Sequence, residues 1–418
     1  MARTDLAESP KGTAPISGAL PIPFEKLPIS QRIHWVHTIL LTVTPVAALY
    51  GLLTTPWVTK TFILTVVTYF LTGFGITAGY HRLWSHRAYD APLATRIFFA
   101  IIGGSAVQGN ILWWCRDHRV HHRFTDTEKD PYGAQNGFWY SHLIWMLFKK
   151  DRNKIGKADV ADLYADPVVM WQRKYYVPII LLFSVILPTC IAGFGWGDWR
   201  GGYFYAVVLR MVIVHHATFC VNSLAHWLGE SSFDDKHTPR DHIITALITF
   251  GEGYHNFHHQ FPQDYRNAIK FFQYDPTKWL ILALSYAGLA SNLRTFPKNE
   301  VQKGQVMMQQ KKIDAIKAKI KWGPTPDVLP SYTMAEYERE VQENGRSWLL
   351  VDGFIHDVTN FIDEHPGGPK YLKTYLGRDA TRAFDGGVYD HSNAARNLMS
   401  MMRIAVLAPT ATTDKKED

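Results

Sequence analysis

Cysteine is scarce in this chain, and its scarcity removes two classes of site. Three cysteines occur among 418 residues, and no two of them form a CxxC pair. We therefore expect neither a disulfide framework nor a thiolate metal site. Arginine-rich helices and zinc-finger spacings are also missing. Nucleic acid therefore ranks last among the partners that the formal net charge of +7 allows, behind anionic lipid and an anionic substrate.

The N-terminal region lacks an apolar core of signal-peptide length. Residues 1–30 are instead rich in proline, alanine, serine and glycine. This composition is typical of a segment that buries too little apolar surface to fold. We expect residues 1–30 to form a disordered cytosolic tail, not a cleaved signal.

Long apolar stretches are what the chain has in quantity. Each of four stretches has about the 20 residues that cross the hydrocarbon core as a helix, and they cover 35–55, 61–80, 176–195 and 203–225. Their spacing in two close pairs favours membrane spans over the buried helices of a soluble protein. A fifth run, 97–114, is interrupted by three glycines. We expect that run to lie at the membrane surface or to line the bundle.

The connectors predict the orientation in the membrane. Four crossings return the chain to its starting side, and the long connector 82–174 carries a cluster of lysine and arginine residues between 149 and 154. Basic clusters near spans favour the cytosol. We therefore expect cytosolic N- and C-termini. The final KKED is similar to a dilysine retrieval signal of the endoplasmic reticulum, which supports that membrane as the location.

The last quarter of the chain differs in composition from the apolar part before it. Residues 298–330 start as a Lys/Gln-rich stretch with apolar residues at helical intervals and end in GPTPDVLP, which breaks any helix. We interpret them as a basic amphipathic linker of a kind that can rest on a membrane surface. A small soluble α+β domain is expected at 331–407, followed by a polar tail at 408–418.

Histidine is abundant, and most of the 19 histidines fall into clusters. HRLWSH begins at residue 81, HRVHH at 118 and HNFHH at 255, and His226 closes NSLAH after the last span. In HxxHH the first imidazole lies one helical turn from the other two, so the rings can converge. The five-residue interval between His81 and His86 fits a continuous helix less well. A helix end or a second metal would resolve that.

One such cluster alone would be an ordinary surface feature, but all of them are expected on the same side of the membrane. Nine imidazoles exceed the four ligands of a structural zinc site. Ligation by imidazole without cysteine favours a borderline metal such as iron. Two such ions would keep open positions, where dioxygen could bind.

These motifs carry a family resemblance. GITAGYHRLWSH, RDHRVHH, NSLAHWLG and GEGYHNFHHQFPQDYRNA resemble the acyl-CoA Δ9 (stearoyl-CoA) desaturases among the integral-membrane fatty acid desaturases. The resemblance implies a mainly α fold over 31–297, with four transmembrane helices and a cytosolic helical cap. His255 stands where front-end desaturases usually carry glutamine, which argues against that group. The resemblance further implies a di-iron centre held by His81, His86, His118, His121, His122, His226, His255, His258 and His259, with Asn222 acting through water.

A second metal centre is expected in the C-terminal domain. His365 lies in a tight HPGG turn and His391 follows in GGVYDHSNAA, so two imidazoles without cysteine suit an electron-transferring haem. The segments WLLVDGFIHDVTNFIDEHPGG and GRDATRAFDGG resemble cytochrome b5, although the interval between the histidines is slightly longer than in its commonest form. The resemblance implies haem b with His365 and His391 as axial ligands. A desaturase followed by cytochrome b5 resembles the fungal Δ9 enzymes.

The resemblance implies a stearoyl-CoA 9-desaturase of unsaturated fatty acid biosynthesis. It would introduce a cis double bond into palmitoyl- or stearoyl-CoA with dioxygen and electrons from its own cytochrome b5. NADH–cytochrome b5 reductase would supply the electrons. Two alternatives stay open: a di-iron fatty acid hydroxylase fused to cytochrome b5, and a membrane haem electron carrier whose histidines store or sense metal.

Substrate residues are expected along the second span. Tyr69, Gly73, Thr77 and His81 recur every four residues, and Tyr69 lies ~18 Å from His81 along a helix axis. We predict that Tyr69 ends the acyl tunnel at about the length of a stearoyl chain. By resemblance, Gln108, Trp114 and Thr218 line the bend of the tunnel, and the CoA head group meets Arg116, Asp117, Lys149 and Lys150. Arg210, His215 and His216 lie inside the fourth span and receive no ligand role.

Overall fold

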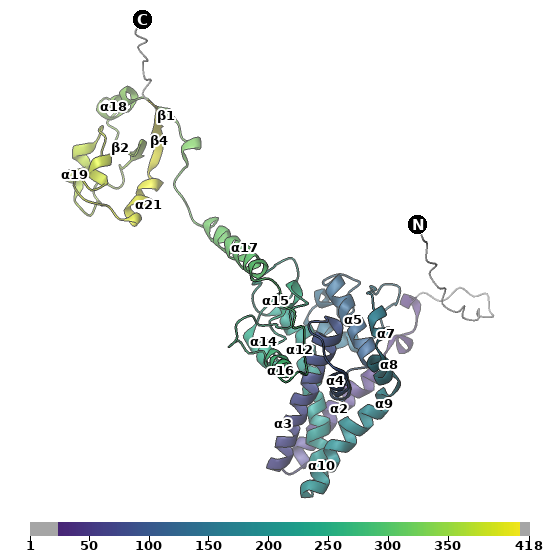
Figure 1. The fold of residues 1–418 in the computed structure, drawn as a ribbon. Helices are drawn as coiled ribbons and strands as arrows, with labels where there is room; N and C mark the ends of the chain where they lie inside the picture. Colours follow the sequence, from purple (N-terminus) through teal and green to yellow (C-terminus); the bar gives the residue numbers. More distant parts are fainter. Residues whose placement is uncertain (1–23, 410–418) are drawn as a thin grey trace. The chain divides into compact units, whose positions relative to one another are not determined.

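The computed structural model describes residues 24–409 (Figure 1). The chain forms two compact units, residues 1–310 and 311–418. Most of the expected N-terminal tail, and KKED at the other end, lie outside the described residues. The described part of that tail contains a short 3-10 turn, η1 (Phe24–Lys26), and the start of helix α1 (Ile29–Arg32).

Within residues 24–409, four helical segments are long and apolar enough to cross a membrane, as predicted, and they cover 35–54, 59–85, 176–196 and 199–227. Helix α2 (Trp35–Thr54) forms the first segment. Helix α3 (Thr59–Phe74) and its continuation η2 (Gly75–Ser85) form the second. The third consists of α9 (Tyr176–Ile179), η5 (Ile180–Ile186) and α10 (Leu187–Trp196). The fourth consists of α11 (Trp199–Gly201), η6 (Gly202–Leu209), α12 (Arg210–Asn222) and α13 (Leu224–Trp227).

The fifth apolar run is divided between two helices, α4 (Leu93–Gly104) and α5 (Ile111–Phe124). Val107 and Gly109 in the break have φ values of 60° and 94°, in the left-handed region that ends helices. Breaking a helix frees backbone carbonyls, which must be satisfied when they are buried. Arg210 donates to the carbonyl of Ser105 at 2.9 Å, and His215 Nε2 lies 3.0 Å from the carbonyl of Ala106.

These contacts give Arg210 the role that its sequence position did not reveal. Its guanidinium also donates to the hydroxyl of Ser184 in η5 at 2.9 Å, and the residue is only 1% exposed. One arginine therefore ties the break between α4 and α5 to the third and fourth membrane segments. Nδ1 of His216 lies 3.0 Å from Nε2 of His142.

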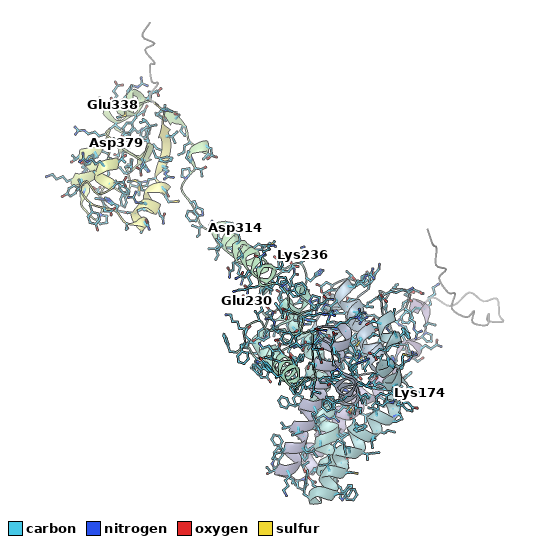
Figure 2. All side chains as sticks on the ribbon, in the orientation of Figure 1. Lys174, Glu230, Lys236, Asp314, Glu338 and Asp379 are labelled. Atoms are coloured by element: carbon cyan, nitrogen blue, oxygen red, sulfur yellow. The ribbon has the colours of Figure 1, made fainter. Side chains whose placement is uncertain are left out.

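Short helices cover one end of the bundle. The main core packs η2, α4 and α5 against one another through residues such as Ile76, Phe99 and Ile111. Figure 2 labels Lys174 at the end of α8, and Glu230 and Lys236 in the loop after α13. The remaining elements of this unit are η3 (Ala134–Asn136), η4 (Tyr140–Ile144), α6 (Trp145–Leu147), α7 (Ala161–Ala165), α8 (Pro167–Lys174), α14 (Ile243–Ile248), α15 (His255–Gln260), α16 (Pro276–Tyr286) and the first part of α17 (Lys298–Lys317).

The C-terminal unit is the small α+β domain that the sequence predicts. Its sheet has the order β1-β4-β3-β2, with β1 parallel to β4 and the other pairs antiparallel. The 3-10 turn η7 (Pro326–Val328) lies in the segment expected to break the linker helix. The elements of the domain are β1 (Ser331–Tyr332), α18 (Met334–Gln342), β2 (Trp348–Val351), β3 (Phe354–Asp357), α19 (Pro369–Tyr375), α20 (Thr381–Phe384), α21 (Asn393–Met401) and β4 (Arg403–Leu407).

Candidate metal and haem sites

The spacing of His81 and His86 is explained by the geometry of η2. This segment is a π-helix, in which backbone hydrogen bonds join residues five apart. The backbone N–H of His86 accordingly donates to the carbonyl of His81 at 3.1 Å. Residues five apart therefore lie on one face, and both imidazoles reach the same group of ligands.

The predicted histidines come together in two groups. Within each group, the ring nitrogens that could bind a metal all lie within 4.8 Å of one another. His86 directly follows η2, and the others come from η2, α5, α13 and α15. These elements are far apart in the chain, so only the folded bundle assembles the ligands. One group contains His81, His86, His118, His122 and His258, and the other contains His121, His226, His255 and His259.

The distances within the groups fit metal ligation. The Nε2 atoms of His81 and His258 are 3.0 Å apart, and those of His255 and His226 are 3.2 Å apart. Two imidazoles bound at right angles to one ion, with metal–nitrogen bonds of about 2.0–2.1 Å, place their nitrogens about 3 Å apart. A shared cation also satisfies facing nitrogens that neutral imidazoles cannot all satisfy by hydrogen bonds.

The protonation of the imidazoles supports the same interpretation. Burial, reinforced by the neighbouring imidazoles, holds the pKa of His122, His258 and His259 well below its ordinary value. The neutral imidazole is the form that binds a metal. The donor set therefore fits metal ions in both groups.

Polar partners behind the rings fix which nitrogen faces the site. His81 Nδ1 lies 2.9 Å from Glu252 in one group, and His121 Nδ1 lies 3.0 Å from Asp130 in the other. Donation from Nδ1 leaves Nε2 free to bind a metal. Burial acts to raise the pKa of Glu252, but its interactions with His81 and Arg82 lower that pKa to about 2.

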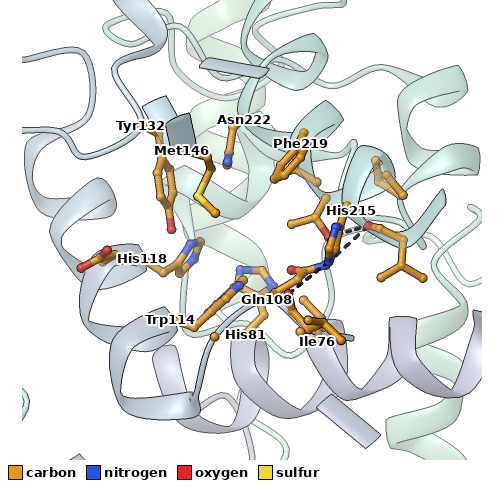
Figure 3. Close-up of a pocket in the computed structure, with 18 of the residues that line it drawn as sticks. Ile76, His81, Gln108, Trp114, His118, Tyr132, Met146, His215, Phe219 and Asn222 are labelled. Carbon is orange, nitrogen blue, oxygen red and sulfur yellow. Dashed lines mark hydrogen bonds between the residues drawn. The ribbon is translucent and has the colours of Figure 1, made fainter. Parts of the chain in front are cut away.

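A cavity adjoins the five-histidine group. Figure 3 shows Gln108, Trp114, His118 and Asn222 around this space. The ring of Trp114 stacks on His118 at a centroid distance of 5.0 Å. Gln108 donates to the hydroxyl of Thr218 at 2.8 Å, which joins the α4–α5 break to α12. Among the predicted substrate residues, the cavity is lined by Gly73, Gln108, Trp114, Asp117 and Thr218.

The other predicted substrate residues lie outside the lining. Tyr69 packs against Phe250 at a ring distance of 5.0 Å. Arg116 forms an ion pair with Asp117 at 2.7 Å. The ammonium groups of Lys149 and Lys150 donate to backbone carbonyls, at 3.0 and 2.7 Å respectively.

His365 and His391 face each other in the C-terminal unit, with ring centroids 6.4 Å apart. Two metal–nitrogen bonds of about 2 Å, together with the inner half-widths of both rings, account for such a separation. The two rings border a cavity of about 830 Å³ with mostly apolar neighbours, such as Phe361 and Val388. His365 Nδ1 lies 3.1 Å from the carbonyl of Gly368, and His391 Nδ1 lies 2.9 Å from that of Phe384. The cavity and the donor set therefore fit a planar macrocycle whose central metal ion is bound by both imidazoles.

Sequence reasoning missed several residues of the sites. Asp130 and Thr238, which contact His121 and His226 respectively, carry no motif that marks them. Glu252 stands three residues before His255, so a carboxylate beside a histidine box was a usable signal. Phe250 and His37 line the cavity although neither belongs to the predicted stripe.

The fold and both kinds of histidine site place the chain among membrane-bound redox metalloproteins. Comparison with known families and proteins is more specific. Residues 55–292 match the model of the fatty acid desaturase family. Residues 333–408 match that of the cytochrome b5-like heme/steroid binding domain. The chain therefore belongs to the fatty acid desaturase family, and it carries a cytochrome b5-like domain.

Individual relatives support this membership. A probable acyl-CoA desaturase of Schizosaccharomyces pombe is 50% identical, over 90% of this chain and 78% of its own length. Acyl-CoA desaturase 1 of Saccharomyces cerevisiae is 46% identical, over 90% of this chain and 74% of its own. Stearoyl-CoA desaturase 5 of Bos taurus is 40% identical, over 65% of this chain and 83% of its own. The two yeast matches are long enough to take in both units.

Proposed function

We propose that this protein is an acyl-CoA Δ9 desaturase. It would convert palmitoyl- or stearoyl-CoA into the cis-monounsaturated product, with one dioxygen, two electrons and two protons yielding two waters. The observation that carries the proposal is the cavity that ends at the five-histidine group, in a chain that also holds a bis-imidazole cleft. An unactivated C–H bond is beyond the acid–base chemistry of side chains, so a metal centre must supply the oxidant.

Each histidine group is proposed to hold one iron, and together the two irons would supply the oxidant formed from dioxygen. Asn222 is proposed to complete the smaller group through a water molecule. It lies one helical turn before His226, a member of that group. The side chains of this protein would hold and orient the imidazoles, through Glu252, Asp130 and Thr238.

The cavity walls are proposed to position the acyl chain. Trp114 would place the chain against His118, on which its own ring stacks. The Gln108–Thr218 pair would shape the bend. Arg116, Lys149 and Lys150 are proposed to meet the phosphates of CoA, for which cationic side chains are suited. Asp117 would hold Arg116 in place.

The C-terminal unit is proposed to deliver the electrons. His365 and His391 would hold haem b, reduced by NADH through cytochrome b5 reductase. A covalent tether raises the effective concentration of the donor at the desaturase unit. We further propose the domain limits 31–297, 298–330 and 331–407, and an endoplasmic reticulum membrane with both termini in the cytosol. The four apolar segments support a multi-pass arrangement.

Expression in a cell that lacks Δ9 desaturase tests the proposal. We expect cis-9 monounsaturated fatty acids, located by mass spectrometry of derivatised double bonds. Hydroxylated products would indicate the fused hydroxylase instead. A protein that assembles haem but forms neither product would be an electron carrier, and that outcome contradicts the proposal.

A further inference from the structure

Phe250 forms part of the cavity wall beside Gly73. It lies two residues after the end of α14, in the turn that leads into α15. Its side chain is 5% exposed and lines the cavity together with Gly73, Ile76 and Thr77. Phe250 therefore meets whatever occupies this part of the cavity.

The ring of Phe250 fills the space that Gly73 leaves open. A Cβ atom placed on Gly73 would lie 2.5 Å from Phe250 Cζ. On its other sides the ring packs against Tyr69, Phe70 and Phe74 at centroid distances of 5.0, 5.3 and 5.6 Å. Tyr69 thus contacts Phe250 and does not line the cavity. The wall on this side is a phenyl ring supported by an aromatic cluster.

The backbone fixes this ring relative to the five-histidine group. Phe250 has φ +58°, a left-handed conformation that is rare for an aromatic residue and persists only where the surroundings enforce it. Its carbonyl accepts a hydrogen bond from Thr277 at 3.2 Å, and Thr277 lies 2.8 Å from Thr77 on η2. Two residues later, Glu252 contacts the ring of His81. Two sets of contacts, one through Thr277 and one through Glu252, therefore hold the wall against the segment that carries His81.

We propose that Phe250 is the specificity-determining residue that stops the methyl end of the acyl chain. The inference rests on the proposed desaturase function. It replaces Tyr69 as the end of the tunnel, with Tyr69 supporting the phenyl ring from behind. Because the stop and the five-histidine group share one rigid frame, the stop limits how many carbons extend beyond the reacting pair.

Substitution of Phe250 tests the inference with a mixture of myristoyl-, palmitoyl-, stearoyl- and arachidoyl-CoA in competition. Phe250→Gly removes the ring and suits the left-handed backbone. We expect the ratio of stearoyl to palmitoyl desaturation to rise at least about tenfold, since the two chains differ by two methylenes and each accommodated methylene changes selectivity by about 10-fold or more. Gly73→Ala places a methyl group where the Phe250 ring lies, and the aromatic cluster blocks retreat of the ring on its other sides. The ring should therefore shift toward the cavity and change the ratio the other way. The double variant should return toward wild type.

Phe62→Ala is the matched control, because Phe62 lies on the same helix α3 but packs against Trp57 and does not line the cavity. Its product profile should stay that of the wild type. If Phe250→Gly yields no product, Phe250→Leu decides, with a smaller shift in the same direction. Unchanged chain-length profiles in an active Phe250 variant and in Gly73→Ala overturn the inference. A wild-type protein that forms no alkene refutes the desaturase function itself, so the two failures are distinguishable.

Discussion

At the scale of single residues, the histidines and their partners differ in how far the sequence reveals them. The nine histidines could be found because two HxxHH spacings repeat beside membrane spans. Their division into five and four could not, since it depends on how η2, α5, α13 and α15 meet. Asp130 is buried against His121 from a loop without any motif. Polar partners of this kind are brought to the histidines only when the chain folds, so the sequence does not mark them.

Glu252 gives the first prediction at this scale. Glu252→Gln keeps the shape of the side chain but removes the charge that holds His81 and Arg82. Loss of a polar partner behind a metal ligand lowers metal affinity or activity by about 10–100-fold. Metal analysis of the purified protein should show reduced non-haem iron, while the haem content stays unchanged. Glu128→Gln, at an exposed position, is the control. Full iron occupancy in the Glu252 variant would contradict the role assigned to this carboxylate.

The same carboxylate predicts a pH dependence of stability. The pKa of Glu252 is lowered from 4.5 to about 2 in the folded protein. A depressed carboxyl pKa contributes stability above the unfolded value, and this contribution is lost as the pH falls from 4.5 toward 2. Melting temperatures of wild type and Glu252→Gln should therefore converge across that interval. A constant difference between the two proteins would show that the charge of Glu252 is not responsible.

At the scale of elements, composition predicts the length of an apolar helical segment better than it predicts whether that segment is one continuous helix. The four membrane-length segments follow from apolar runs of sufficient length. The run 97–114 is interrupted by three glycines in the sequence, and the structure divides it between α4 and α5. The π geometry of η2 was also hidden, because a five-residue histidine interval is compatible with a helix end or with a second ion. Both features depend on contacts from other elements.

Arg210 provides the prediction at this scale. Arg210→Met should leave the carbonyl of Ser105 and the hydroxyl of Ser184 without their donor. A buried polar group that loses its partner costs about 1–3 kcal/mol. The melting temperature of the membrane unit in detergent should fall by several degrees, with the haem spectrum unchanged. Lys60→Met, at an exposed position in the first turn of α3, controls for loss of a cation. Equal melting temperatures for the two variants would contradict this role of Arg210.

At the scale of the whole molecule, one chain joins two units that serve different chemistry. The desaturase family match falls within the first unit, and the cytochrome b5-like match within the second. The change in amino-acid composition after the linker made this division predictable from the sequence. That His365 and His391 face each other was less predictable, because a tight turn and a later loop must meet across the cavity.

Loss of the haem should separate electron supply from catalysis. His365→Ala should remove the haem absorption band and lower the iron content from about three to about two per chain, because a bis-imidazole haem loses one axial ligand. Desaturation should fall strongly, while the two histidine groups keep their iron. Soluble cytochrome b5 added at high concentration should restore part of the activity, since it replaces a tethered donor by one in solution. Full activity without haem and without added cytochrome b5 would contradict the proposed electron route. Lost non-haem iron would show instead that His365 supports the fold of the first unit, which its place in a separate compact unit argues against.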